Sequence, residues 1–235
     1  YRLKYHQGAF HEQGSIRDIR HNVRSMAEDN KGNLWLGTFR NGVYKVHFNQ
    51  WDQPPHSVDL YGNEAVFPSL RNINVYRYRQ RVLFATENGI YRYHPTNDTF
   101  ALDSGFLTAL PGPRRGVFAM DYDTTGQVWM SGLNNRKESI VYGIPDGGGF
   151  RWRATPFQRI PEMMVLDIYV DTGNVVWFGG SEGLFRYQPN PLYSHKPYQT
   201  LIRQVALDGD SVIFHGTFYS QPGKKGQLVP GQAAS

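Results

Sequence analysis

The sequence predicts an all-β chain built mainly of β-propeller blades, about four units of four antiparallel strands each. Four segments share a strand–turn–strand pattern, and a large aromatic residue recurs in them every 45–49 residues, at Trp35, Phe84, Trp129 and Trp177. Such a period with several short strands is typical of propellers. No helical periodicity persists, so an α/β fold is not expected. A sandwich of irregular hairpins, the main alternative, would not repeat an aromatic residue at this spacing.

The first unit shows how the strands are assigned. Residues 23–28 alternate between apolar and polar, as a half-buried strand does. Residues 34–38 are expected to form the second strand, whose tryptophan fills the space between neighbouring sheets. Residues 42–46 are expected to form the third strand, and the stretch near residues 48–51 the fourth and outermost strand.

The turn between the first two strands begins with an aspartate in three units, at Asp29, Asp123 and Asp171. An aspartate accepts hydrogen bonds from nearby backbone amides, and a glycine supplies a positive φ. Asn174 stands where Gly126 stands in the third unit, and asparagine also tolerates the left-handed region. Because these aspartates repeat from blade to blade, we expect them to hold turns rather than to catalyse.

The domain boundaries follow from the repeat. Residues 1–15 are expected to end a preceding blade, and residues 16–190 to form four blades. Open blade edges expose unpaired strands, so we expect a larger propeller or a partner chain. Residues 221–235 are rich in Gly, Pro and Gln, which predicts a flexible tail.

Composition narrows the function classes. The chain of 235 residues contains no cysteine, which excludes disulfides, zinc ribbons and thiol nucleophiles. No apolar run approaches the roughly 18–20 residues that span a bilayer. Lys and Arg exceed Asp and Glu by 25 − 20 = 5, which favours either an anionic ligand or a solvated arginine-rich surface. Residues 76–81 alternate Arg and Tyr, as a strand with a solvated face does, and nucleic-acid binding is not expected.

Catalytic residues, metals and cofactors are not expected. The eight histidines form no close pair for a metal, and neither a nucleophile elbow nor a phosphate loop is present. A propeller glycosidase or polysaccharide lyase would need acidic or tyrosine residues unique to one blade and facing the channel. The candidates would be Glu64, Glu138, Glu162 and Tyr61, but no spacing argument gathers them.

The loops around one mouth of a propeller are a more promising place for a ligand. This face carries the connections between blades and the turns between second and third strands. Cationic side chains in these loops would suit a carboxylate or sulfate, such as that of an acidic sugar. The residues are Arg20, His21, Arg40, Arg71, Arg114, Arg115 and Arg136. The alternative, that these are scattered solvated side chains, stays open.

The repeat resembles a known family. Residues 23–45, with Val23, Ser25, the Glu28-Asp29 pair and the Leu-Trp-Leu-Gly-Thr strand, resemble the two-component regulator propeller repeat almost position for position. Residues 165–186 match well, with Asp167 and Val170 where that family usually has Ser and Glu. The third unit has a longer insert at residues 133–139, and the second unit is the most degenerate.

The resemblance implies a location and a role. Propellers of this family form the periplasmic sensor region of hybrid histidine kinases, mostly in Bacteroidetes. It implies a homodimeric parent protein, an oligosaccharide ligand and no chemistry in the propeller itself. Residues 197–216 resemble the first strands of the three-tyrosine β-sandwich that follows such propellers. We therefore expect residues 191–220 to be a linker and the start of an immunoglobulin-like sandwich.

Three functional hypotheses result. The first is a ligand-sensing, non-catalytic propeller segment of a two-component sensor. The second is a propeller glycosidase or lyase, and the third is a scaffold that binds another protein.

Overall fold

A computed structural model describes residues 1–63, 65–106, 109, 116–134, 137–154, 157, 163–189, 204–207 and 211–215. The chain divides into two compact units, Tyr1–Pro189 and Asn190–Ser235. The described residues contain strands and short 3₁₀ turns and no α-helix. None of their helices is long and apolar enough to cross a membrane.

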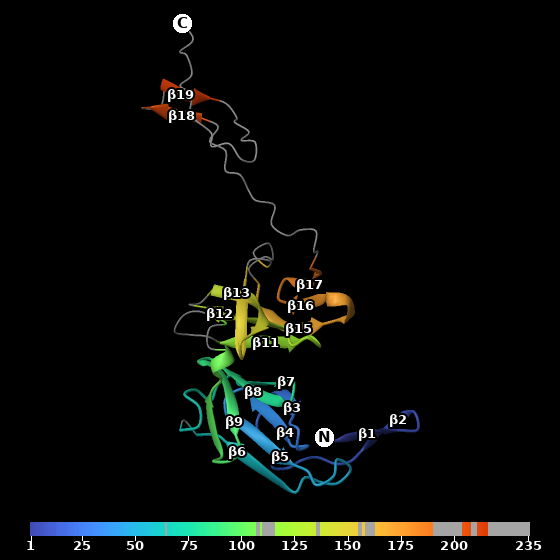
Figure 1. Cartoon of the computed structure of the whole chain (residues 1–235). Coiled ribbons are helices and arrows are strands. Elements are labelled where there is room, and N and C mark those ends of the chain that lie inside the picture. The colour runs from blue at the N-terminus through green and yellow to red at the C-terminus, as the bar shows by residue number, and fades with distance from the viewer. Residues whose placement is uncertain are drawn as a thin grey trace. The chain divides into compact units, whose positions relative to one another are not determined.

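After an N-terminal hairpin, the first unit is a succession of four antiparallel sheets (Figure 1). This confirms the predicted all-β propeller-blade class. The first three sheets have four strands each, in meander order. Their strands are β3 (Val23–Glu28), β4 (Leu34–Thr38), β5 (Val43–His47) and β6 (Ser57–Tyr61); β7 (Asn74–Tyr78), β8 (Arg81–Thr86), β9 (Gly89–His94) and β10 (Thr99–Leu102); and β11 (Val117–Tyr122), β12 (Val128–Asn134), β13 (Lys137–Asp146) and β14 (Gly149–Arg153).

The fourth sheet has three strands within the described residues: β15 (Val165–Val170), β16 (Val176–Gly180) and β17 (Gly183–Tyr187). Short 3₁₀ turns occur at Ser104–Phe106 and Thr172–Asn174. The insert predicted in the third blade lengthens the hairpin of β12 and β13, whose pairing reaches Asn134 and Lys137.

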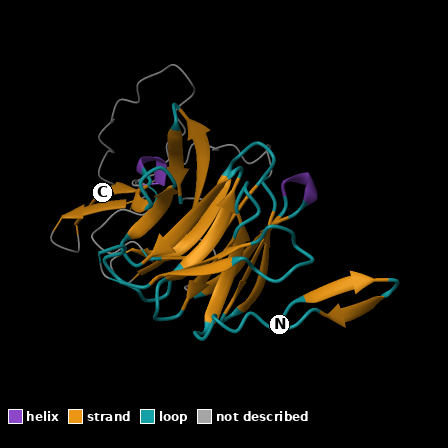
Figure 2. Cartoon of the chain, turned by 90° about the horizontal axis from the view of Figure 1, so that it is seen from below, coloured by secondary structure: helices purple, strands orange, loops and turns teal. Residues whose placement is uncertain are grey.

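The N-terminal hairpin pairs only with itself among the described strands. It consists of β1 (Leu3–His6) and β2 (Ala9–Glu12), and all eight residues are exposed. Figure 2 shows it projecting away from the four sheets. The Arg2 guanidinium donates a hydrogen bond to the carbonyl of Gln53 in the first blade. Its assignment to a preceding blade stays a prediction.

The fourth strand of the first blade lies later than the sequence suggested. Residues 57–61, not 48–51, pair with β5. Phe48 and Trp51 instead stack on each other, with ring centroids 4.5 Å apart, in the connection that leads to β6. Two consecutive prolines, Pro54 and Pro55, follow them, and proline restricts the backbone and lacks an amide donor. The chain therefore resumes pairing only after this connection.

The first strand of each blade packs against the first strand of the next, so that β3, β7, β11 and β15 follow one another. Polar bridges join them. The Val75 amide donates to Ser25 Oγ (2.8 Å), the Tyr76 hydroxyl donates to the Phe118 carbonyl (2.6 Å), and the Val170 amide donates to Asp121 Oδ2 (2.7 Å). Each bridge satisfies a polar group that burial between sheets would otherwise leave unpaired.

Side chains of the second strands make the apolar contacts between neighbouring blades. Trp35 is 1% exposed and packs toward the second blade, where its ring meets Phe84 at 5.0 Å. Trp129 is buried in the same way against the fourth blade. Full burial of one such side chain contributes about 1.5–3 kcal/mol, so these contacts hold neighbouring sheets together.

The strand register corrects the second repeat anchor. Trp35 pairs with Lys45, Trp129 with Tyr142 and Trp177 with Arg186, and Leu83 makes the equivalent pair with Arg92. Phe84 therefore occupies the next position, equivalent to Leu36, and faces the preceding blade rather than the following one. The other three blades have a β-bulge in their first strand, and the second blade has none, so its equivalent residue comes one position earlier. A shift of one residue reverses the face of a strand.

The second compact unit, Asn190–Ser235, contains a hairpin among its described residues. In it, β18 (Gln204–Leu207) pairs with β19 (Ser211–His215). The predicted start of an immunoglobulin-like sandwich at residues 191–220 stays a prediction. The predicted tail at residues 221–235 lies outside the described residues.

Candidate functional site

The repeated aspartates hold the turns between first and second strands. Asp29 accepts hydrogen bonds from the amides of Lys31 and Asn33 and, through Oδ2, from the Trp35 indole at 3.0 Å. Asp171 accepts from the Thr172 amide and the Trp177 indole. Asn174 has φ 61°, the left-handed conformation expected of it. These side chains hold the turns of the first and fourth blades.

Asp123 holds the corresponding turn of the third blade. Its Oδ1 accepts hydrogen bonds from the amides of Thr125 and Gln127, both at 2.9 Å. Gly126 completes the turn with φ 87°. All three predicted turn aspartates therefore make the local hydrogen bonds that their spacing suggested.

The two predicted sets of loops lie together at the start of the first strands. In the first blade, the Phe39 amide donates to the Asn22 carbonyl, and the Asn72 amide donates to the Phe39 carbonyl. The third and fourth blades repeat the contact, from the Leu133 amide to the Gly116 carbonyl and from the Ser181 amide to the Met164 carbonyl. Interblade connections and second-to-third-strand turns thus share this end of the sheets.

A β-bulge occurs at the second residue of the first strand in three blades. The register shifts between Val23 and Ser25, between Val117 and Ala119, and between Val165 and Asp167. A bulge leaves one residue unpaired and redirects its side chain. In the first blade the bulged residue is Arg24.

Arg24 belongs to a small group that we call the Phe39 cluster: Arg24, Phe39, Arg40, Asn72 and Glu87. The guanidinium carbons of Arg24 and Arg40 lie 5.6 and 5.1 Å from the centroid of the Phe39 ring. Arg24 Nη1 donates to Asn72 Oδ1 at 2.6 Å, and Asn72 Nδ2 donates to Glu87 Oε1 at 3.4 Å. Asn72 has φ 51°, a conformation that asparagine tolerates better than most residues.

The Phe39 cluster has the chemistry of an anion-binding site. Phe39 is 40% exposed, and both arginines are exposed. Two guanidinium groups on one ring provide several hydrogen-bond donors for a carboxylate or sulfate, and the ring offers a flat apolar surface. Among the described residues Glu87 contacts the cluster through Asn72, and neither arginine forms an ion pair with a carboxylate. Both arginines therefore keep donors for a ligand.

Acidic groups lie further along the first strands. Burial raises the pKa of Asp121, although the amides of Val170 and Tyr122 donate to it; the nearby Asp167 raises it further. Burial also raises the pKa of Tyr76, with Asp167 adding to the effect and Arg24 opposing it. Arg24 of the first blade and Asp167 of the fourth blade therefore have opposite effects on the pKa of the Tyr76 hydroxyl.

The predicted cationic residues separate into three groups. Arg40 joins the Phe39 cluster, whereas Arg20 and Arg71 are exposed loop residues. The His21 ring stacks on Tyr44, with Nδ1 2.6 Å from the tyrosine hydroxyl, and so covers the first blade's own apolar face. The remaining predictions, Arg114, Arg115 and Arg136, lie outside the described residues.

Arg24 was missed because strand residues were not considered as loop-face candidates. The sequence signal for it is weak, since an exposed arginine in an alternating strand is ordinary. Its position one residue into the strand, at the site of a bulge that repeats in three blades, is visible only in the register.

Of the four residues considered for an enzyme, the structure describes two, Tyr61 and Glu138. The Tyr61 hydroxyl donates to Asp98 Oδ1 at 2.7 Å, and its ring stacks on Trp35 between the first two blades. Burial raises the pKa of Tyr61, and the Asp98 carboxylate raises it further. Glu138 lies on β13, and Glu64 and Glu162 lie outside the described residues. The described part of the chain contains no group of three metal-ligating side chains.

Comparison with known proteins identifies the repeat. The family model described as "Two component regulator propeller" matches residues 19–40, which contain the turn of Asp29 and the second strand with Trp35. Within the first blade, this segment is similar to the two component regulator propeller repeat. No curated protein sequence matches the chain.

Solved structures share the fold of this chain. The extracellular domain assigned to the hybrid two component system BT4673 of B. thetaiotaomicron superposes with a TM-score of 0.58 at 19% identity. That of BT3049 from the same organism superposes with a TM-score of 0.53 at 21% identity. The matches cover 89% and 86% of this chain but only 25% and 27% of those chains. The chain thus spans about a quarter of these structures' length.

Proposed function

We propose that this chain is a non-catalytic, ligand-sensing segment of the extracytoplasmic propeller of a two-component sensor. The regulator propeller repeat at residues 19–40 and the fold shared with extracellular domains of hybrid two component systems support this role. In this proposal the chain works outside the cytoplasm, within a homodimeric parent protein whose output domain lies elsewhere.

The Phe39 cluster is the proposed ligand site, and it is the single observation that carries the ligand class. Its two exposed guanidinium groups would pair with carboxylate or sulfate groups, and the exposed Phe39 ring would stack on a sugar ring. The ligand class that fits is an acidic oligosaccharide. Arg71, next to Asn72 in the loop, could extend the site along a longer chain.

The test compares an acidic oligosaccharide with its neutral analogue. We expect oligogalacturonate to bind by isothermal titration and to raise the melting temperature, while neutral galactan oligosaccharides do not. A ligand that binds only the folded state stabilises it by about 2.7 kcal/mol at 100 times its dissociation constant. Chromatography of the same mixture should recover the oligosaccharide intact.

Matched variants locate the site. The double variant Arg24→Gln with Arg40→Gln should weaken binding at least tenfold with an unchanged melting temperature, because both side chains are exposed. Lys31→Gln, in the exposed turn after β3, should bind normally. Equal binding of neutral and acidic ligands, or an unaffected double variant, would contradict the site. Formation of a product would favour the glycosidase or lyase hypothesis. Absence of binding to any glycan would favour the protein-binding scaffold.

A further inference from the structure

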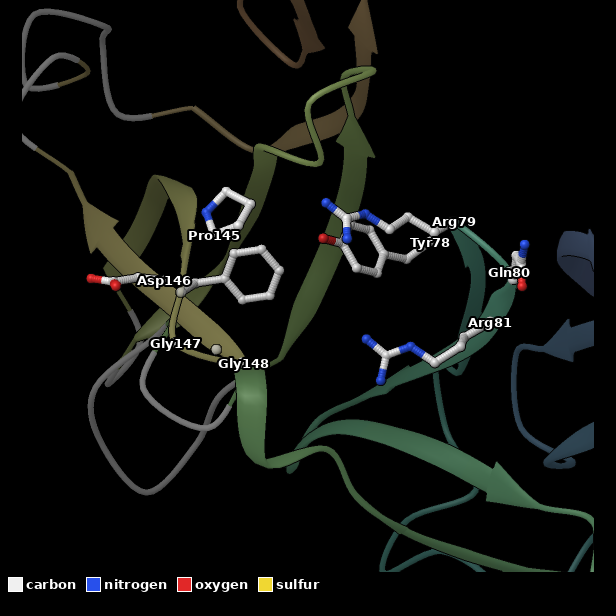
Figure 3. Close-up of a pocket in the computed structure, with 10 residues that line it drawn as sticks. Tyr78, Arg79, Gln80, Arg81, Pro145, Asp146, Gly147 and Gly148 are labelled. Carbon is white, nitrogen blue, oxygen red and sulfur yellow. The ribbon is translucent and has the colours of Figure 1, made fainter.

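A pocket lies at the other end of the strands from the Phe39 cluster. It measures about 560 Å³ and lies between the turn joining β7 to β8 and the turn joining β13 to β14 (Figure 3). Its volume falls within the range of roughly 300–1,000 Å³ typical of small-molecule sites. One wall comes from the second blade and the other from the third.

Local backbone geometry shapes both walls. Arg79 has φ 55°, and Gly147 and Gly148 have φ 55° and 88°, so both turns are tight hairpins. The second-blade wall is fixed to the third blade, because the Tyr78 hydroxyl donates to the Gly126 carbonyl and Arg79 Nη2 donates to the Thr125 carbonyl, both at 3.0 Å. The pocket is therefore held by contacts at its base.

Two cationic side chains enter the pocket from one side. The guanidinium carbons of Arg79 and Arg81 lie 5.4 and 5.8 Å from the ring centroid of Tyr78. Arg81 Nη1 is 3.3 Å from the carboxylate of Asp103, which is buried. No carboxylate pairs with Arg79 among the residues that the structure describes. Arg79 therefore has unneutralised charge and free donors at the pocket.

The opposite wall is apolar where it faces these arginines. Phe150 of β14 lies 5.8 Å from Tyr78 between ring centroids, in an edge-to-face arrangement, and Pro145 of β13 is its cross-strand partner. The one acidic residue in the lining, Asp146, points away from Arg79 and Arg81 (Figure 3). It lies 3.7 Å from Arg151 instead. The pocket thus combines a cationic wall with a ring-bearing wall.

We propose that this pocket binds a small anion built on a ring, with its carboxylate or sulfate group on Arg79 and Arg81 and the ring against Phe150 and Pro145. Paired guanidinium groups suit planar oxyanions, and an aromatic wall suits a flat ring. This second site goes beyond the proposed sensing of oligosaccharides at the Phe39 cluster. A sugar acid and an aromatic acid share the required chemistry.

The experiment titrates the two ligand classes, a sugar acid and an aromatic acid, separately. D-glucuronate and benzoate are added to the Arg24→Gln/Arg40→Gln background, which removes the Phe39 cluster, and binding is followed by amide chemical shifts. We expect saturable shifts at Gly147 and Gly148 with at least one probe and none with glucose or benzamide. The probe that binds identifies the source. No saturable shift with either probe up to tens of millimolar would overturn the proposal.

Variants in the same background test the charge. Arg79→Gln removes the positive charge and keeps a polar side chain, and it should weaken binding at least fivefold. Arg153→Gln, at an exposed arginine further along β14 and outside the pocket lining, should not. Gln80→Glu and Gln80→Lys change only an exposed turn residue, and they should weaken and strengthen binding about twofold, since Coulomb interactions at this range survive partial screening. Equal affinities for these two variants would refute an electrostatic site.

Discussion

The aspartate of the repeat stabilises its turn through several donors at once. Asp29 Oδ1 accepts two backbone amides, and Oδ2 accepts the Trp35 indole and the Asn33 side chain. Partial burial disfavours the charged carboxylate, but these hydrogen bonds outweigh it and lower the pKa of Asp29. The charged form is thus the one that the fold requires.

Substitution of Asp29 should be costly and dependent on pH. Asp29→Ala leaves the donors without their acceptor, and we expect a loss of about 1–2 kcal/mol in unfolding free energy at pH 7. Because the folded pKa is lowered, the stabilisation is present above the unfolded value of about 3.9 and is lost as pH falls through the folded pKa. Urea unfolding at pH 7 and at pH 3 should show the two proteins converging in stability.

Asn30→Ala, an exposed change in the same turn, provides the control for Asp29→Ala. It should change stability by less than about 0.5 kcal/mol. A difference between wild type and Asp29→Ala that stays constant down to pH 3 would show that the carboxylate charge does not stabilise the turn.

At the level of the blade, the same tryptophan position is used in different ways. Trp35 and Trp177 donate to the turn aspartates of their own blades. Trp129 is just as buried as Trp35, but its indole nitrogen has no acceptor among the described residues. The second blade has Leu83 there and no turn aspartate; its turn is held by Tyr78 and Arg79 against the third blade. The position of Trp35 in the repeat therefore carries a large apolar side chain in every blade, but a hydrogen bond to a turn aspartate forms only in the first and fourth of these blades as described.

This difference gives a prediction for two matched substitutions. Trp35→Phe and Trp129→Phe remove similar apolar volume, but only Trp35→Phe breaks a hydrogen bond. We expect Trp35→Phe to be more destabilising by about 1 kcal/mol, measured by denaturant unfolding. Equal losses would mean that the indole–aspartate bond contributes nothing to stability.

Within the first unit, each blade covers the tryptophan-bearing face of the blade before it, up to the fourth blade. The register puts Tyr169, Trp177 and Leu184 on the face of the fourth sheet that is turned away from the third blade. Tyr169 and Leu184 are 60% and 67% exposed. The equivalent positions Trp35, Leu83 and Trp129 are buried by the following blade. This exposed face is consistent with the expectation of further blades or a partner, which stays a prediction.

The exposed face gives a prediction about this chain alone. Leu184→Ser should change its unfolding free energy by less than about 0.5 kcal/mol, because the side chain is already in water. On the opposite face, Val176→Ala removes two methyl groups from a fully buried position and should cost about 1–2 kcal/mol. Thermal unfolding of both variants tests this. A large loss for Leu184→Ser would mean that this face is covered in solution.

The sequence by itself determined the blade repeat and its local chemistry. Alternation in residues 23–28, the turn aspartates and the left-handed Asn174 are properties of short segments, and the structure confirms each of them. The loop-face location of Arg40 followed from the repeat in the same way. These features could be predicted because periodicity and turn preferences act over a few residues.

Only the tertiary structure decided the pairing register and the sites. In the structure the repeat anchor of the second blade is Leu83 rather than Phe84. The fourth strand of the first blade comprises residues 57–61 rather than 48–51. The tertiary structure also brought Arg24 onto Phe39 through a bulge and joined two hairpin turns of different blades around one pocket. The physical reason is that register and interblade contact depend on how whole sheets pack, and a one-residue shift in pairing reverses which side chains face the neighbour.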